Sequence, residues 1–433
     1  MSKELEFAQD LIDYIYDSPT AFHAVSRAKE DLSKEGFVEI KEEEKWSLKK
    51  GGKYFVTKND SALTAFVVGK GEIEENGFKI IGAHTDSPSF RIKPAPEMVV
   101  DNTYVRLNTE VYGGPILSTW MDRPLAIAGR VTLRSDNILS PYSRLVNINK
   151  PIMIIPNVAI HMNREVNKGI ELNKQKDTLP LLTMVSEELE KDCYLMNSIA
   201  KELSVEPNQI IDFDLFLYEY QKGSIIGLNN EFISSSRLDD LAMVHAGIRA
   251  IAKGPATLAT NVMVCFDNEE VGSATKQGAD SNMLINILER ITLSLNKNRE
   301  DFLRAICKSF IISADNAHAV HPNSPEKHDP TNKPYINKGP VIKISANQSY
   351  TTDSNSGAVY ELICEKAGVP VQKFVNRSDV PGGSTIGPIS STHINIRSVD
   401  MGSPTLAMHS IRELGGVIDH TYVTKSFEEF FKI

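Results

Sequence analysis

Cysteine is scarce in this chain of 433 residues, and its four copies lie far apart. Cys193, Cys265, Cys307 and Cys364 include no pair separated by only two residues. This spacing argues against a structural zinc–thiolate site and provides no disulfide framework. We therefore expect all four to be reduced thiols.

A basic excess and long apolar runs are also missing. The chain has 47 Lys and Arg against 56 Asp and Glu, a formal net charge of −9, so no surplus of positive charge is present to neutralise phosphates. No apolar run approaches the roughly 18 residues that suggest a membrane span. The segment from Met1 to Phe7 is acidic and amphipathic, unlike a secretory signal. These features predict a cytoplasmic protein with no nucleic-acid partner and no membrane partner.

The composition, with 41% hydrophobic and 24% charged residues, suits a globular protein with a sizeable core. Strand and helix patterns alternate toward both ends of the chain. We predict helices at 4–16, 21–34 and 237–253, and strands at 78–83, 261–266, 309–313 and 393–398. Between them, short strand-like runs alternate with Gly, Pro and Asn turns, with one helix at 194–203. The sequence therefore predicts an α/β domain of residues 1–94 and 229–433, interrupted by a β-rich insertion of residues 95–228.

Acids and histidines follow the ends of three predicted strands. The residues at these positions are His84 and Asp86, Glu269 and Glu270, and Asp315 and His318. In open α/β sheets, ligands bind outside the carboxyl ends of the strands, so we expect these side chains to form one shared site. Asp239 and Asp240, in the first turn of a predicted helix, and His409, in an apolar stretch, are further candidates.

Each of these signals also has an ordinary structural interpretation. Asp239 and Asp240 could simply face the helix macrodipole, and His409 could be a buried, hydrogen-bonded histidine. Together, however, two histidines and several carboxylates suit a divalent ion bound through nitrogen and oxygen. A bridging aspartate would allow two ions about 3.5–4 Å apart, and Asp86 could orient the imidazole of His84. The pattern indicates a dinuclear hydrolase and leaves its substrate open.

Longer motifs, spread over almost the whole chain, add a resemblance. The two longest are SADNAHAVHPN, from Ser313 to Asn323, and MGSPTLAMHSIRE, from Met401 to Glu413; others begin at Gly82, Tyr112, Ser118, Arg237, Asp267, Gly339 and Thr385. With these motifs the sequence resembles the aspartyl aminopeptidase family of dinuclear zinc exopeptidases. The resemblance implies a three-layer, zinc-exopeptidase-like α/β domain with a mixed central sheet, in which the insertion serves oligomerisation or acts as a lid.

The resemblance also implies a set of metal ligands. His84, Asp239 and Asp315 would hold one zinc. Asp239 would bridge to a second ion, which Glu270 and His409 would complete. Zn²⁺ is the expected metal, although Co²⁺ and Mn²⁺ suit the same ligands.

Further roles follow from the same resemblance. Glu269 would be the general base acting on a metal-bridging water, and His318 would lie against the substrate. Lys343 and Tyr350 would also contact substrate, with the lysine attracting an acidic N-terminal side chain. His161 would reach into a neighbouring subunit's site in a homo-oligomer, a dodecamer in this family.

The sequence departs from the family pattern in places. Asp240 is asparagine in many relatives, and Asn316 and the loop at 381–385 differ from the commonest eukaryotic forms. An acidic preference therefore competes with a broad or leucine-preferring aminopeptidase. A related metal-dependent deacylase is a further alternative, against which Lys343 and Tyr350 argue. A non-catalytic assembly protein is disfavoured because Glu269 and all five metal ligands are present.

Overall fold

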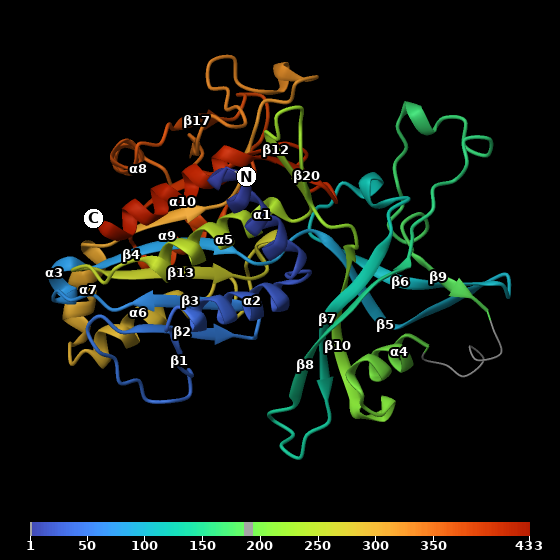
Figure 1. The fold of residues 1–433 in the computed structure, drawn as a ribbon, viewed down its shortest axis with the longest axis horizontal. Helices are drawn as coiled ribbons and strands as arrows, with labels where there is room; N and C mark the ends of the chain where they lie inside the picture. The colour runs from blue at the N-terminus through green and yellow to red at the C-terminus, as the bar shows by residue number, and fades with distance from the viewer. Residues whose placement is uncertain (1, 186–193) are drawn as a thin grey trace. The chain divides into compact units, whose positions relative to one another are not determined.

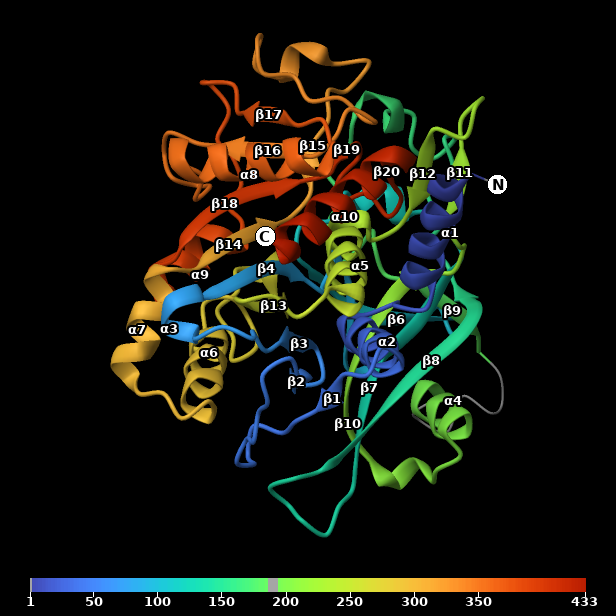
Figure 2. The ribbon, with the colours of Figure 1, turned by 60° about the vertical axis from the view of Figure 1, so that its left-hand side comes forward.

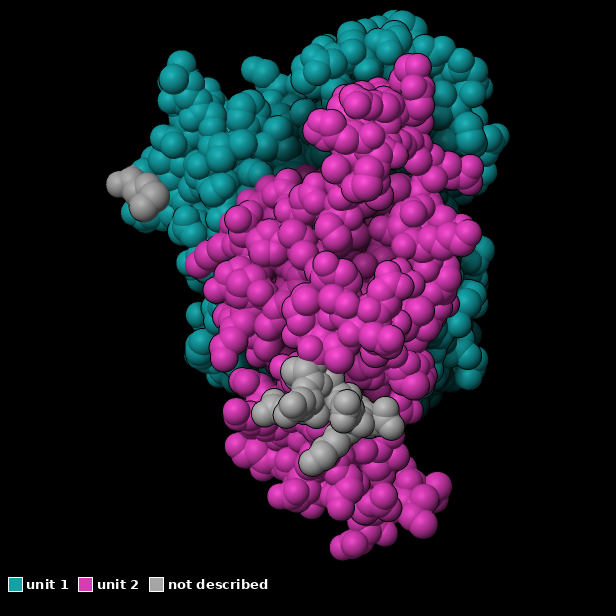
Figure 3. Space-filling view, turned by 90° about the vertical axis from the view of Figure 1, so that its right-hand side faces the viewer, with its two compact units in different colours: residues 1–86, 223–408, 413–433 teal, residues 87–222, 409–412 magenta. Residues whose placement is uncertain are grey.

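A computed structural model of the chain describes residues 2–185 and 194–433. Cys193 falls outside these residues, whereas Cys265, Cys307 and Cys364 are free thiols. The chain divides into two compact units, coloured separately in Figure 3. Unit 1 comprises residues 1–86, 223–408 and 413–433, and unit 2 comprises residues 87–222 and 409–412. No helix among the described residues is both long and apolar enough to cross a membrane.

Unit 1 is built on a nine-stranded mixed sheet. Its strands, in spatial order, are β1 (Val38–Glu39), β2 (Lys53–Lys58), β3 (Ala62–Val67), β13 (Thr260–Phe266), β4 (Phe78–His84), β14 (Phe310–Ala314), β18 (Arg397–Gly402), β16 (Val341–Ile344) and β17 (Gln372–Val375). The four strands β13, β4, β14 and β18 run parallel to one another. Helices surround this sheet in Figures 1 and 2.

Alternating side chains of the central strands face two separate hydrophobic clusters. In β13, Met263 and Cys265 join one cluster, and Val262, Val264 and Phe266 join the other. The first cluster includes residues of α1 (Lys3–Tyr16), α2 (Ala21–Lys34), α5 (Leu238–Lys253), α8 (Ser354–Ala367) and α10 (Val417–Lys432). The second includes residues of α3 (Ile73–Asn76), α6 (Met283–Ser294), α7 (Arg299–Cys307) and α9 (Ile386–Ile394). This two-sided burial makes a helix–sheet–helix sandwich, so the predicted three-layer α/β class is confirmed.

Two small sheets complete unit 1. One joins β11 (Ser224–Ile226), β12 (Phe232–Ser235) and β20 (Glu413–Gly416), and the other pairs β15 (Ala317–His318) with β19 (Pro404–Thr405). The predicted strand at 393–398 is wrong in its first part. His393 and Ile394 end helix α9, Asn395 turns with a φ of +58°, and β18 begins only at Arg397. Ile394, at the end of the helix, and Ile396, in the turn, are both buried, so hydrophobicity alone could not separate helix from strand here.

Unit 2 contains a six-stranded antiparallel sheet with its own hydrophobic cluster. Its strands, in spatial order, are β8 (Tyr142–Met153), β7 (Leu125–Leu133), β10 (Ile210–Glu219), β5 (Ser89–Val100), β6 (Tyr104–Tyr112) and β9 (Leu181–Met184). Helix α4 (Tyr194–Leu203) buries Leu195, Ile199 and Leu203 in that cluster. The unit begins at residue 87, ahead of the predicted 95, because β5 starts at Ser89 and pairs with β6 and β10.

Candidate metal centre

Three neighbouring parallel strands of unit 1 deliver the predicted site residues to one edge of the sheet. β4 ends at His84, β13 ends three residues before Glu269, and β14 ends immediately before Asp315. β4 lies between the other two strands, and the carboxyl ends of parallel strands meet at the same edge. These strand ends therefore bring His84, Glu269 and Asp315 to the same edge of the sheet, as the strand pattern predicts.

The start of α5 adds two more acids through an irregular backbone. Arg237, just before the helix, has a left-handed φ of +55°, and Asp239 and Asp240 have non-helical dihedral angles. Their carboxylates are buried, so they do not act as solvated first-turn acids facing the macrodipole. The backbone N–H of Asp239 donates to Glu413 Oε2 at 3.0 Å, and this bond holds the turn against β20.

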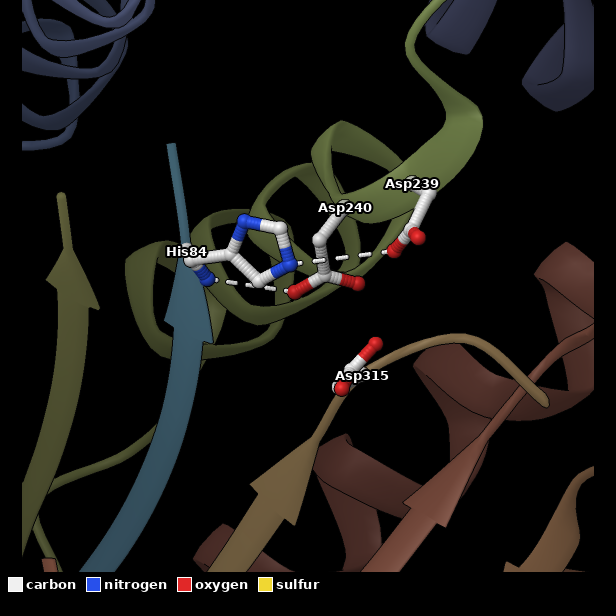
Figure 4. A group of neighbouring side chains, drawn as sticks. All are labelled: His84, Asp239, Asp240 and Asp315. Carbon is white, nitrogen blue, oxygen red and sulfur yellow. Dashed lines mark hydrogen bonds and ion pairs between the residues drawn. The ribbon is translucent and has the colours of Figure 1, made fainter. Parts of the chain in front are cut away.

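These elements bring one imidazole and three carboxylates together (Figure 4). One side-chain nitrogen or oxygen from each of His84, Asp239, Asp240 and Asp315 lies within 4.8 Å of the others. His84 Nε2 is 3.7 Å from Asp239 Oδ1, and the His84 backbone N–H donates to Asp240 Oδ2 at 3.1 Å. All four residues are buried, with Asp315, at 7%, the most exposed.

The electrostatics of this group favour a bound cation. Burial, followed by the charges of neighbouring aspartates, raises the pKa of Asp240 well above its usual value, and burial is also the main cause that raises the pKa of Asp315 to about 6. Burial opposes charging of the His84 imidazole, but Asp240 and Asp239 outweigh it and raise the His84 pKa. Asp240 Oδ1 is buried and has no hydrogen-bond partner among the described residues. A donor set of imidazole nitrogen and carboxylate oxygen suits zinc, so these residues fit such an ion.

Asp86 links this group to the two adjacent glutamates. Its Oδ1 accepts the backbone N–H of Glu269, and its Oδ2 accepts that of Glu270, both at 3.1 Å. The same Oδ1 lies 3.3 Å from His84 Nδ1. His84, Glu269 and Glu270 also form a second group with ligand atoms within 4.8 Å of one another. A single carboxylate thus orients the imidazole and the loop that carries both glutamates.

Lys343 lies deep beside the cluster and is already engaged there. Its Nζ donates to the backbone carbonyl of Asn316 at 2.9 Å and lies 3.4 Å from Asp315 Oδ2. The side chain is buried, and its Nζ lies 5.5 Å from the centre of the Tyr350 ring. The nearest partners of this ammonium are therefore protein groups, whereas the sequence predicted a substrate side chain.

The remaining predicted residues are spread more widely. His318, in β15, is exposed and stacks edge-on against Phe374, with ring centroids 6.0 Å apart. His409 and His161 belong to unit 2. Within that unit His409 Nδ1 lies 3.1 Å from the carbonyl oxygen of Gly114, and His161 is exposed between β8 and β9.

Two residues of the site were not assigned a role from the sequence. The sequence marks Asp240 as a candidate because it adjoins Asp239, but spacing cannot decide which of the two acids has which role. The sequence does not mark Glu413 at all, because a glutamate at the start of a short strand gives no indication that it will accept an N–H from residue 239. Only the fold brings β20 next to α5.

Comparisons with known proteins agree with this geometry. Residues 14–431 match the family described as Aminopeptidase I zinc metalloprotease (M18). This chain belongs to the M18 family. A probable M18 family aminopeptidase 2 of Clostridium novyi is 67% identical over the full length of both proteins.

Solved structures of M18 proteins share the fold. Ape4, in a complex with Nbr1, has a TM-score of 0.94 at 37% identity, over 98% of this chain and 85% of that one. The mApe1 dodecamer of Saccharomyces cerevisiae has a TM-score of 0.86 at 30% identity, over 98% and 96%. As an M18 protein, this chain is a metal-dependent aminopeptidase, a hydrolase of the zinc metalloprotease class.

Asp86 contacts His84 and the backbone N–H groups of Glu269 and Glu270, and these three contacts lead to a first prediction for this M18 aminopeptidase. In Asp86→Ala, two backbone N–H groups lose their acceptor and His84 loses its orienting carboxylate. We expect kcat/KM on peptides to fall about 10–100-fold, with a parallel loss of zinc affinity. Peptide hydrolysis and zinc titration would measure both quantities. Asp136→Ala, which removes an exposed aspartate from unit 2, is the matched control, and equal behaviour of the two variants would contradict the assignment.

Proposed function

We propose that this M18 aminopeptidase holds two zinc ions and removes the N-terminal residue of peptides, with a preference for Asp and Glu. The observation that carries the proposal is the excess of negative charge at the strand ends. Six carboxylates gather there around His84, and Lys343 lies beside one of them, Asp315. The six are Asp86, Asp239, Asp240, Glu269, Glu270 and Asp315. Two divalent cations would neutralise this excess more nearly than one.

The proposed ligands divide between the two ions. His84, Asp239 and Asp315 hold the first, and their grouping within 4.8 Å supports this assignment. Asp239 would also contribute to the second site, together with Glu270 and His409. The assignment of His409 rests on the resemblance of the motif that ends in Met408 and His409.

When bound, zinc supplies positive charge that polarises the scissile carbonyl and lowers the pKa of water. Glu269 takes a proton from the attacking water and later delivers it to the leaving amine. Burial, aided by the charges of Asp315 and Asp86 and opposed by His84, raises the pKa of Glu269 to about 7. A group that must accept and return a proton works best when its pKa lies near the working pH.

The substrate-binding residues in this proposal are His318, Lys343, Tyr350 and His161. His318 lies against the reacting peptide group, on the short strand that follows Asp315. Lys343 lies beside Asp315, with its ammonium over the Tyr350 ring, and contributes a fixed positive charge to the substrate site. His161 completes a neighbouring subunit's site.

That role of His161 requires a homo-oligomer, and we propose a dodecamer like that of yeast mApe1. The β-rich part of the chain, unit 2, would then serve assembly or cover the site. We place the enzyme in the cytoplasm, where the free thiols of Cys265, Cys307 and Cys364 would remain reduced.

A peptide panel and a metal count test this function together. We expect release of the N-terminal residue from Glu-, Asp-, Leu- and Lys-peptides to be fastest with Glu and Asp. An N-acetylated peptide should resist cleavage, because a site rich in carboxylates favours a free amine. Metal analysis after zinc restoration should give two equivalents per subunit.

The other outcomes distinguish the alternatives. Faster release of Leu would retain the aminopeptidase chemistry and remove the acidic preference. Cleavage of the acetylated peptide at the same rate would favour the deacylase, and one equivalent of zinc at full activity would contradict the dinuclear site.

A further inference from the structure

Lys343 is poorly placed to bind a substrate carboxylate directly. Its ammonium donates to Asn316 O at 2.9 Å and lies 3.4 Å from Asp315 Oδ2, and only 4% of the side chain is exposed to solvent. A substrate carboxylate at this position would have to compete with Asp315. If the enzyme recognises acidic substrates, another cationic group should therefore supply the contact.

Such groups line a neighbouring pocket of about 310 Å³ in unit 1. Its cationic and imidazole side chains are His318, His321, Lys327, His328 and Arg377. Among the described residues that line this pocket, none is Asp or Glu. In a protein with a net charge of −9, a concave surface without any acid is an unusual local environment, and it suits an anion.

Phe374 connects the pocket with the candidate metal centre. It lies in β17, directly opposite Lys343 of β16 in the parallel register, so the two side chains emerge on the same face of the sheet. The Phe374 ring contacts Tyr350, with centroids 6.5 Å apart, and Tyr350 lies beneath the Lys343 ammonium. The rings of His318 and His328 meet the same phenylalanine edge-on, with centroids at 6.0 and 6.3 Å. The rings of Phe374 and Tyr350 thus connect the pocket with Lys343.

The positive charge of the pocket comes mainly from two residues. Arg377 is held by Asp379 through two hydrogen bonds, at 2.7 and 2.8 Å, and this pairing offsets its charge. Lys327 is exposed, and its charge, after the hydrogen bond from Arg377, helps to lower the pKa of Asp379. Burial, the first of several causes, lowers the pKa of His328, so this imidazole acts as a neutral group. Lys327 and Arg377 are therefore the cations of the pocket, with Asp379 near both, and Lys327 is the less tightly paired of the two.

We propose that the pocket of His318, Lys327 and Arg377 is a carboxylate-binding subsite for the peptide substrate. The inference rests on the proposed aminopeptidase function and adds, to the fixed positive charge of Lys343, a pocket whose cations contact the carboxylate directly. The bound group is a carboxylate of the peptide. Its two possible sources are the side chain of an N-terminal Asp or Glu and the C-terminal carboxylate of a short peptide.

Three peptides separate these sources. Glu-Ala-Ala amide and Gln-Ala-Ala amide differ only in the charge of the N-terminal side chain. Gln-Ala-Ala with a free C-terminus differs from its amide only in the terminal carboxylate. In one of these two pairs, the parent enzyme should cleave the peptide that carries the extra carboxylate faster than its neutral partner. The pair that shows this preference identifies which carboxylate the pocket binds.

The double variant Lys327→Gln/Arg377→Gln tests the pocket itself. We expect the preferred ratio of kcat/KM values to fall about tenfold, while release of Leu from Leu-Ala-Ala amide and the zinc content stay unchanged. Lys327→Gln alone changes only an exposed side chain and should give part of this loss, which guards against a structural effect at Arg377. Lys333→Gln is the matched control, because Lys333 lines an adjoining pocket and is absent from this one.

Each result bears on a different claim. An unchanged ratio in the double variant, or a parent enzyme without preference in either pair, would overturn the carboxylate subsite and leave the aminopeptidase function intact. Failure of the zinc-restored parent to release any N-terminal residue would instead overturn the proposed function. An equal loss in Lys333→Gln would show that general surface charge, and no specific pocket, attracts the substrate.

Discussion

Glu269→Gln is expected to reduce kcat on peptides by about 10²–10⁴-fold, the usual contribution of a general base. Glutamine preserves the size of the side chain but cannot accept the proton of the attacking water. The backbone N–H of residue 269 would still donate to Asp86, so the loop should keep its position. We therefore expect unchanged zinc content and unchanged thermal stability in the presence of zinc, because Glu269 is assigned no ion.

The control for this variant is Glu43→Gln, which makes the same chemical change at an exposed position. Initial rates and zinc analysis of the three proteins are the required measurements. A Glu269→Gln enzyme that works at the parental rate would remove this residue from the mechanism. A variant that loses zinc together with activity would show that Glu269 is a ligand, and would exchange the proposed roles of the two adjacent glutamates.

Asp239→Asn should weaken metal binding and activity together. Asp239 Oδ1 faces His84 Nε2, and the residue's N–H is fixed by Glu413, so the substitution should leave the backbone in place while removing one negative charge. Because this carboxylate is assigned to both ions, its loss should weaken both. We expect zinc affinity to fall sharply and kcat/KM to fall about 10³-fold, the size of effect that a bound ion's charge stabilisation supplies.

A second property separates this effect from misfolding. Burial is the main cause that raises the pKa values of Asp315 and Glu269, and the charge of Asp239 raises both further, which means that these acids repel one another when no cation is present. Removing one of them should leave the chelator-treated protein as stable as the parent or more stable in thermal unfolding. Asp136→Asn is the control for the substitution itself. Full zinc loading and full activity in Asp239→Asn would contradict the shared-ligand assignment.

Much of the fold could be predicted from periodicity. The predicted helices at 21–34 and 194–203 coincide with α2 and α4, because their apolar residues recur at helical spacing and a turn signal ends each one. The central strands were recognisable as short apolar runs. The prediction of a strand at 393–398 failed because Ile394, at the end of α9, and Ile396, in the turn before β18, are both buried, and a run of six residues is too short for helical and strand periods to differ.

The candidate site was predictable to the extent that its residues follow strands. His84, Glu269 and Asp315 each come after a buried run, and sheet geometry alone predicts that they meet. The turn before α5 was not predictable, because the left-handed Arg237 and the extended Asp239 depend on the contact with Glu413. The hydrogen bond of Lys343 could not be predicted either, because its acceptor is the backbone carbonyl of Asn316. Hydrogen bonds between residues far apart in the chain leave no pattern in the local sequence.

The position of β4 in the central sheet also bears on how the enzyme is made. The chain through β4 is complete at residue 84, but the strands that flank it, β13 and β14, begin only at Thr260 and Phe310. At a synthesis rate of roughly 5–20 residues per second, β4 waits on the order of 10–50 s for both neighbours. For the first part of that interval His84 has neither Asp239 nor Asp315 as a neighbour, and Asp315 is added only after β14. The nascent chain therefore cannot assemble this centre until about three quarters of it has been synthesised.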